Sequence, residues 1–127
     1  MNMEKVVFAF FILLALTLNF GFFYGELDDP AQHHASELFA ALVVSLVATV
    51  MKFGDRTPVG SVLLAASLVA DLQLIAAAVV WAVVTQGMDA PLSPGVTASI
   101  VSLSGGALLA NFVSVVLLIM ETFVARR

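Results

Sequence analysis

Long apolar runs separated by short polar stretches dominate the pattern of this 127-residue chain. The four runs are Val6–Tyr24, Leu38–Phe53, Val59–Thr85 and Val96–Val124. About 20 helical residues cross the hydrocarbon core of a bilayer, whereas the strands of membrane barrels are about half that length. The pattern therefore predicts an all-α polytopic membrane protein, a four-transmembrane-helix up-down bundle, with one transmembrane domain over residues 1–127.

Polar residues followed by proline mark three of the expected helix starts. A side-chain oxygen before the first turn accepts from free backbone N–H groups, and proline suits the first helical position because it has no N–H. Asp29-Pro30, Thr57-Pro58 and Ser93-Pro94 fit this pattern, and Gly54 stands where the second helix should end. We expect helices at about 6–24, 30–53, 58–86 and 94–124.

Basic residues set the expected orientation, because cytoplasmic loops of membrane proteins carry most of the Lys and Arg. With a cytoplasmic N-terminus, all five basic residues lie on the cytoplasmic side: Lys5, Lys52, Arg56, Arg126 and Arg127. The first apolar run exceeds the core of a cleaved signal peptide, and no A-x-A-like site follows it. The sequence thus predicts a multi-pass protein with cytoplasmic N- and C-termini and a retained first helix.

Composition agrees with this class of protein and excludes several functions. Hydrophobic residues make up 61% of the chain and charged residues 11%, so no soluble domain is expected. The absence of cysteine excludes disulfides and thiolate chemistry. A net charge of −4 offers no basic surface for nucleic acid. The lipid bilayer is the one partner that composition requires.

Asp71 lies in the middle of the third run and is the main candidate for chemistry. A carboxylate at the bilayer centre costs about 2.5–3.5 kcal/mol on insertion scales, so such residues are paired, hydrated or functional. Asn111, Ser67 and Ser45 come to similar depths in an up-down bundle. We expect these four residues to form a polar cluster, either as a cation or proton site or as a hydrogen-bonded fastening between the third and fourth helices.

Small residues recur at every fourth position of the fourth run, at Ala98, Ser102, Gly106, Ala110 and Ser114. Such a stripe lets helix backbones approach closely. It either packs the fourth helix within the bundle or forms an interface in a homo-oligomer or with a larger membrane-protein partner. A neighbouring face carries Ser104, Ala107, Asn111 and Ser114.

Histidines and acids gather in the connection between the first and second runs. His33, His34 and Glu37 have helical spacing, and divalent metals accept imidazole and carboxylate ligands. Because Asp29 also caps a helix and this segment is solvated, two interpretations stay open besides a plain polar loop: a metal site, or a sensor of external pH.

The chain shows no pattern of an enzyme. No serine has a histidine and an acid at its depth, and no phosphate-binding glycine loop occurs. We therefore expect neither catalysis nor an organic cofactor.

Two stretches, "ELFAALVVSLVATVMKFGDRT" and "SLVADLQLIAAA", resemble an uncharacterised group of small bacterial inner-membrane proteins. This resemblance implies the bacterial inner membrane and no particular activity. The leading functional hypothesis is an oligomeric protein related to ion transport, with Asp71 as its cation or proton site. The alternative is a non-catalytic accessory or assembly subunit of a larger membrane complex.

Overall fold

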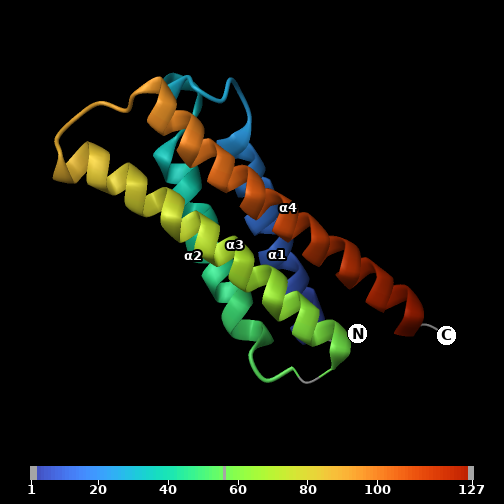
Figure 1. The fold of residues 1–127 in the computed structure, drawn as a ribbon. Coiled ribbons are helices and arrows are strands. Elements are labelled where there is room, and N and C mark those ends of the chain that lie inside the picture. Colours follow the sequence, from blue (N-terminus) through green and yellow to red (C-terminus); the bar gives the residue numbers. More distant parts are fainter. Residues whose placement is uncertain (1–2, 56, 126–127) are drawn as a thin grey trace.

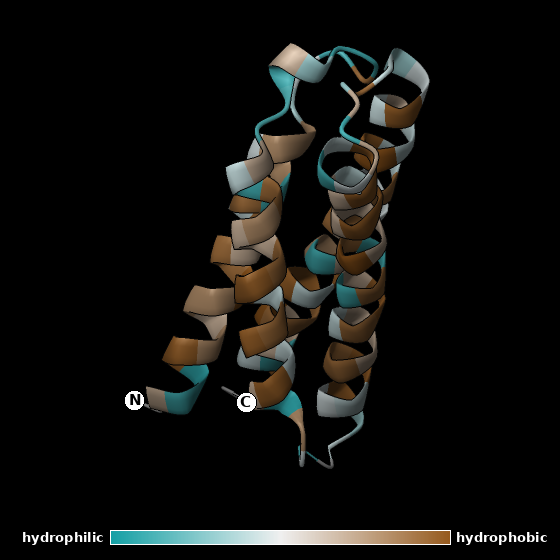
Figure 2. Cartoon of the chain, turned by 90° about the vertical axis from the view of Figure 1, so that its left-hand side faces the viewer, coloured by the Kyte–Doolittle hydropathy of each residue, from teal (hydrophilic) through white to brown (hydrophobic). Residues whose placement is uncertain are grey.

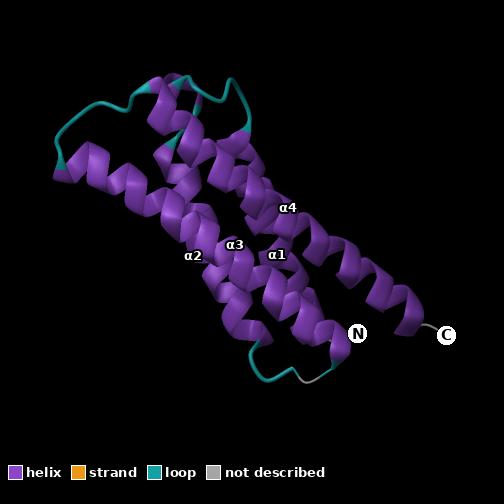
Figure 3. Ribbon diagram, viewed as in Figure 1, coloured by secondary structure: helices purple, strands orange, loops and turns teal. Residues whose placement is uncertain are grey.

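The computed structural model describes residues 3–55 and 57–125, and four long helices make up most of them (Figures 1 and 3). These are α1 (Met3–Phe23), α2 (Ala35–Lys52), α3 (Pro58–Ala82) and α4 (Pro94–Ala125). Two short elements, η1 (Pro30–Gln32) and η2 (Val83–Gly87), join them. All four helices are long and apolar enough to cross a membrane, which confirms the predicted all-α bundle.

The helices form an up-down bundle in which chain neighbours are also neighbours in space. The main contacts join α1 to α2, α2 to α3, α3 to α4 and α4 back to α1. Both ends of the chain and the α2–α3 turn lie at one end of the bundle, and the other two connections lie at the opposite end (Figures 1 and 2). Lys5 and Lys52 are at the first of these ends. Arg56, Arg126 and Arg127 lie outside the described residues.

Two of the three predicted helix starts are found where the sequence places them. Thr57 Oγ1 accepts from the N–H of Gly60 at 2.9 Å and caps α3, and Ser93 Oγ accepts from the N–H of Val96 at 3.2 Å at the start of α4. Gly54 follows the end of α2 with φ of +91°, a left-handed conformation that favours glycine.

The predicted start of the second helix at Pro30 is wrong. Asp29 does accept from the N–H of Ala31 at 3.0 Å, but this cap begins only the single 3₁₀ turn η1. His33 and His34 then have extended backbone, and α2 starts at Ala35. The reason is local: His33 turns its ring toward the end of α1, where it contacts the Phe22 carbonyl oxygen, and this breaks the helical path.

The end of α3 also differs from a plain α-helix. Its last turn, η2, is π-helical from Val83 to Gly87, so the spanning segment reaches Gly87. A π-helical turn contains more residues than an α-helical turn, so it changes which side chains of the helix face the bundle. The turn nonetheless agrees with the expected end of the third helix near residue 86.

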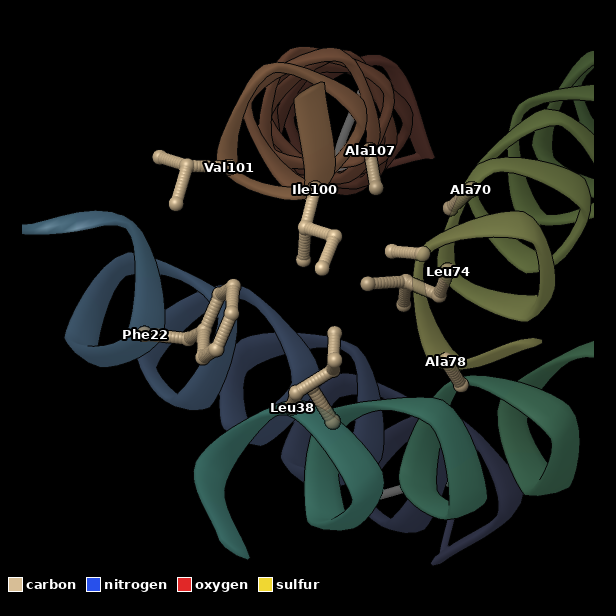
Figure 4. Packing of buried hydrophobic residues seen from close by; sticks show 10 residues of the cluster. Phe22, Leu38, Ala70, Leu74, Ala78, Ile100, Val101 and Ala107 are labelled. Carbon is tan, nitrogen blue, oxygen red and sulfur yellow. The ribbon is translucent and has the colours of Figure 1, made fainter. Parts of the chain in front are cut away.

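Apolar side chains pack inside the bundle in two clusters. The outer cluster, nearer the α1–α2 and α3–α4 connections, includes Phe22, Leu38, Leu74 and Ile100 (Figure 4). The inner cluster, nearer the chain ends, consists of Phe8, Ile12, Ala48 and Leu63, with Val115 and Leu118 packed against it. Alanines at many of these positions allow the helices to approach closely.

Most residues along the helices are apolar, and polar residues gather mainly at the two ends of the bundle (Figure 2). In the most apolar stretch of each helix, 39% of the α3 residues are buried inside the bundle, but only 17% of the α4 residues are. Side chains such as Leu72 and Leu109 are more than two-thirds exposed, as expected of residues that face lipid tails. The helix with the largest free apolar face is therefore α4.

Asp55 organises the turn between α2 and α3. Its Oδ1 accepts from the N–H of Thr57 at 3.0 Å and from Thr57 Oγ1 at 2.7 Å, and its Oδ2 lies 3.4 Å from Lys52 Nζ. These bonds, first that from the Thr57 hydroxyl, hold the pKa of Asp55 below its usual value. The turn is thus stabilised when Asp55 is ionised.

Acidification is expected to weaken this turn. A pKa lowered by folding contributes stability that is present above the unfolded value, about 3.9, and is lost as the pH falls through the folded value. We expect Asp55→Asn to unfold at a midpoint that changes less with pH than that of the wild type below about pH 4. Detergent-unfolding curves at stepwise lower pH measure this difference, and parallel profiles of the two proteins would contradict it.

Candidate functional site

Asp71 is held in the interior of the bundle by two hydroxyl groups of α2. Its side chain is 5% exposed and lies near the middle of its spanning segment, roughly 20 Å from Pro58 and roughly 24 Å from Gly87 at 1.5 Å per residue. Ser45 Oγ donates to Asp71 Oδ1 at 2.7 Å. Thr49 Oγ1 lies 2.5 Å from Asp71 Oδ2 and 2.9 Å from the carbonyl oxygen of Ser45.

The local sequence explains this arrangement. Ser45 and Thr49 are four residues apart, so they share one face of α2. The tight Gly54–Pro58 turn makes α2 and α3 antiparallel neighbours, which brings that face against Asp71. Asp71 is also the one ionisable residue in the middle of a spanning helix, since Glu4, Lys5, Glu37, Lys52 and Glu121 all lie toward helix ends.

A hydrogen bond from Asp71 to Asn111, one way in which the sequence could fasten the third helix to the fourth, is not formed. Asn111 is fully buried in α4, and neither its Nδ2 nor its Oδ1 has a hydrogen-bond partner among the described residues. Ser67 Oγ, one turn from Asp71 on α3, is likewise buried and without a partner there. Asp71 turns to α2 and not to α4, so of the three expected partners it bonds only Ser45.

Ser45, Ser67 and Asn111 all lie along their helices between residues of the outer and inner apolar clusters. On α2, Ser45 lies between Ala41 of the outer cluster and Ala48 of the inner one; on α3, Ser67 lies between Ala70 and Leu63 in the same way. Asn111 lies between Ala107 of the outer cluster and Val115, which packs on the inner one. We refer to these three buried residues between the two clusters as the polar layer; Asp71 is one turn from Ser67 and in contact with Ser45.

Thr49 and Asn19 are two further buried polar residues that were not recognised as site residues from the sequence pattern. Thr49 is the second partner of Asp71. Asn19, fully buried in α1, pairs with Ser104 of α4. In the amide orientation that satisfies both of its atoms, Asn19 Nδ2 donates to Ser104 Oγ and to the Ser104 carbonyl oxygen at 3.2 Å, and Oδ1 accepts from the N–H of Leu108 at 3.1 Å. Hydrogen bonds between side chains therefore connect α2 to α3 at Asp71, and α1 to α4 at Asn19 and Ser104. We refer to the second connection as the α1–α4 joint.

The stripe of small residues on α4 is only partly turned inward. Ser114 is buried, Ala98, Gly106 and Ala110 are half-buried, and Ser102 is exposed. Gly106 faces α3, where a Cβ would come within 2.5–2.8 Å of the Gln73 side-chain amide. The neighbouring face, with Ser104, Ala107, Asn111 and Ser114, is the fully buried one. At Gly106 the stripe thus packs helices within one chain, and its use between chains stays a prediction.

The metal site that the sequence left open at His33, His34 and Glu37 is not formed. Among the described residues no group of three or more His, Cys, Asp or Glu side chains is placed to hold a metal ion. The physical reason is that His33 is buried and faces backbone: Nδ1 lies 2.5 Å from the Phe22 carbonyl oxygen and Nε2 lies 2.6 Å from that of Glu26. His34 is exposed at the start of α2, and the Glu37 carboxylate lies against Gly21 of α1.

Four membrane-spanning helices around a buried acid and a polar layer define the class: a multi-pass α-helical membrane protein with a hydroxyl-bound intramembrane carboxyl group. Residues 32–122 match the model of a family of unknown function, DUF6394, and the chain belongs to this family. No curated protein and no solved structure matches the chain. The match includes Ser45, Thr49, Asp71 and Asn111, whereas Asn19 lies before it.

Proposed function

We propose that this protein moves a cation or proton across the bacterial inner membrane, with Asp71 as the ion site. The observation that carries the proposal is the burial of one carboxyl group at mid-membrane, with hydroxyls as its partners. A purely structural hydrogen bond between helices needs no ionisable group, and intramembrane acids mark ion and proton pathways in many membrane proteins. Asn111 and Ser67 supply further polar atoms in the same layer.

The proposed orientation places both termini and the α2–α3 turn in the cytoplasm. Lys5 lies near the start of α1 and Lys52 ends α2, and with a cytoplasmic N-terminus the sequence predicts all five Lys and Arg residues on the cytoplasmic side. The four helices pack closely around apolar clusters above and below the polar layer. Because one closely packed bundle leaves little room for an aqueous path, we propose that transport takes place in an oligomer. The proposal involves no catalysed reaction and no cofactor.

Flux through liposomes containing the purified protein tests this function. Wild-type protein is expected to dissipate an imposed proton or sodium gradient, and Asp71→Asn to lower the rate to that of empty liposomes. The matched control is Ser104→Ala, which removes a buried hydroxyl from the α1–α4 joint and leaves Asp71 and its partners intact. Equal flux in wild type and Asp71→Asn, with both proteins folded, would refute the assignment of Asp71.

A second candidate, an accessory subunit, is favoured by the apolar groove between α1 and α4. This groove has a volume of about 410 Å³ and is lined by Leu16, Thr17, Phe20, Leu108, Leu109 and Phe112. Because the chain has no cysteine, Leu109→Cys introduces a unique thiol in the groove for cross-linking in native membranes. An adduct larger than a dimer supports an accessory role, whereas a dimer identifies a second copy of this chain.

A further inference from the structure

The number of donor hydrogens available for the contacts around Asp71 differs between the ionised and the neutral carboxyl group. The hydroxyl of Thr49 has one proton but two acceptors in reach, the Ser45 carbonyl oxygen at 2.9 Å and Asp71 Oδ2 at 2.5 Å. The carbonyl oxygen accepts only. If Asp71 is ionised, Thr49 donates to one acceptor and leaves the other contact without a proton.

A proton on Asp71 Oδ2 supplies the missing hydrogen. The acid then donates to Thr49 Oγ1, Thr49 donates to the Ser45 carbonyl oxygen, and Ser45 Oγ donates to Asp71 Oδ1. Each contact in this closed chain has one donor and one acceptor. We infer that Asp71 is held as the neutral acid, with its proton on Oδ2 directed at Thr49, and that the ion of the proposed transport is a proton.

The surroundings of Asp71 favour a proton over a metal cation. A metal ion binds through oxygen lone pairs, yet both carboxyl oxygens already face hydroxyl groups, and no group of three or more His, Cys, Asp or Glu side chains is placed to hold a metal ion among the described residues. The titratable residues on the two helices packed against α3 are Glu37 and Lys52 of α2 and Glu121 of α4, and all three lie toward helix ends. Lys52 pairs there with Asp55, and Glu121 with Lys5.

Thr49 also accommodates the ionised state that proton transfer requires. When a water molecule takes the proton, the Oδ2–H bond breaks, its electron pair stays on the carboxylate, and the water becomes hydronium. The Thr49 hydroxyl then turns from the Ser45 carbonyl oxygen to Oδ2, while Ser45 Oγ keeps its bond to Oδ1. Ser67 Oγ and the Asn111 amide are buried and have no hydrogen-bond partner among the described residues, so they are suited to bind that water.

Infrared difference spectra of the protein in liposomes test the neutral acid directly. The spectrum of wild type minus Asp71→Asn at neutral pH is expected to show a carboxylic-acid C=O band that shifts in D₂O. In Ser45→Ala this band is expected at higher frequency, because the C=O group loses its hydrogen bond. Thr49→Ser is expected to retain the wild-type band, whereas Thr49→Val alters it. Ser104→Ala, outside this network, is the matched control.

The inference on the transported ion depends on the proposed function, and the two fail in different ways. A band of an ionised carboxylate in place of the acid band at neutral pH overturns the inference that Asp71 is neutral. In that case, sodium flux that disappears in Asp71→Asn would still support the proposed transport function. An acid band without any flux supports the proton on Asp71 and refutes the proposed function. An acid band with proton flux that is lost in Asp71→Asn and lowered in Thr49→Val, but kept in Thr49→Ser, supports both.

Discussion

Replacing Gly106 by leucine is expected to lower the free energy of unfolding by about 1–3 kcal/mol, the usual range for overpacking a close contact. Gly106 lies where α4 crosses Gln73 of α3, and even a Cβ comes within 2.5–2.8 Å of the glutamine amide. A methyl group meets only the far end of a flexible side chain, so Gln73 can move away. A leucine side chain is too large for that adjustment and must separate the two helices.

A graded series at this site tests the argument. Gly106→Ala is expected to unfold near the wild-type midpoint, because the gain in helix propensity offsets the displacement of Gln73. Gly95→Leu is the matched control on the same helix, since nothing lies within 4 Å of a Cβ there. The single tryptophan, Trp81, reports unfolding by its fluorescence, as its ring packs 5.9 Å from that of Phe22. Equal midpoints for the two leucine variants would show that α4 does not pack on α3 at Gly106.

The sequence predicts the position of a residue along its helix better than the side of the helix on which the residue lies. Depth along a helix follows from residue counting, which is why similar depths could be predicted for Ser45, Ser67 and Asn111, and each of them lies along its helix between residues of the outer and inner clusters. To predict which side of a helix faces the bundle requires an amphipathic pattern. The α3 segment is apolar on nearly all sides, because it contacts lipid as well as protein. The choice between α2 and α4 as the partner of Asp71 therefore could not be made from sequence.

The residues missed at the site have the same explanation. Thr49 resembles any threonine in a membrane helix, where the hydroxyl bonds to the carbonyl four residues before it, as it does here to Ser45. Its spacing of four from Ser45 was the available signal. Asn19, the one amide side chain in the middle of the first apolar run, was a clearer signal. The error at His33 arose because a buried ring that contacts two backbone carbonyls leaves no periodic pattern in the sequence.

Asp71→Ala is expected to destabilise the bundle by about 1–3 kcal/mol, because it removes both side-chain bonds between α2 and α3 and leaves the Ser45 hydroxyl to find another acceptor. Asp71→Asn is expected to be nearly as stable as the wild type. Its amide oxygen accepts from Ser45, and its NH₂ group donates to Thr49, so it reproduces the bonds of the neutral acid.

The comparison of these two variants separates stability from ion transport. A double-mutant cycle between Asp71→Ala and Ser45→Ala, followed by Trp81 fluorescence, is expected to give a coupling energy of about 0.6–1.7 kcal/mol, between the average and the maximum found for hydrogen bonds between membrane helices. No coupling would mean that the two side chains do not bond in the bilayer. Because Asp71→Asn keeps the bonds but has no proton to release, a folded and inactive Asp71→Asn assigns the carboxyl group to transport, whereas unchanged flux limits it to joining α2 and α3.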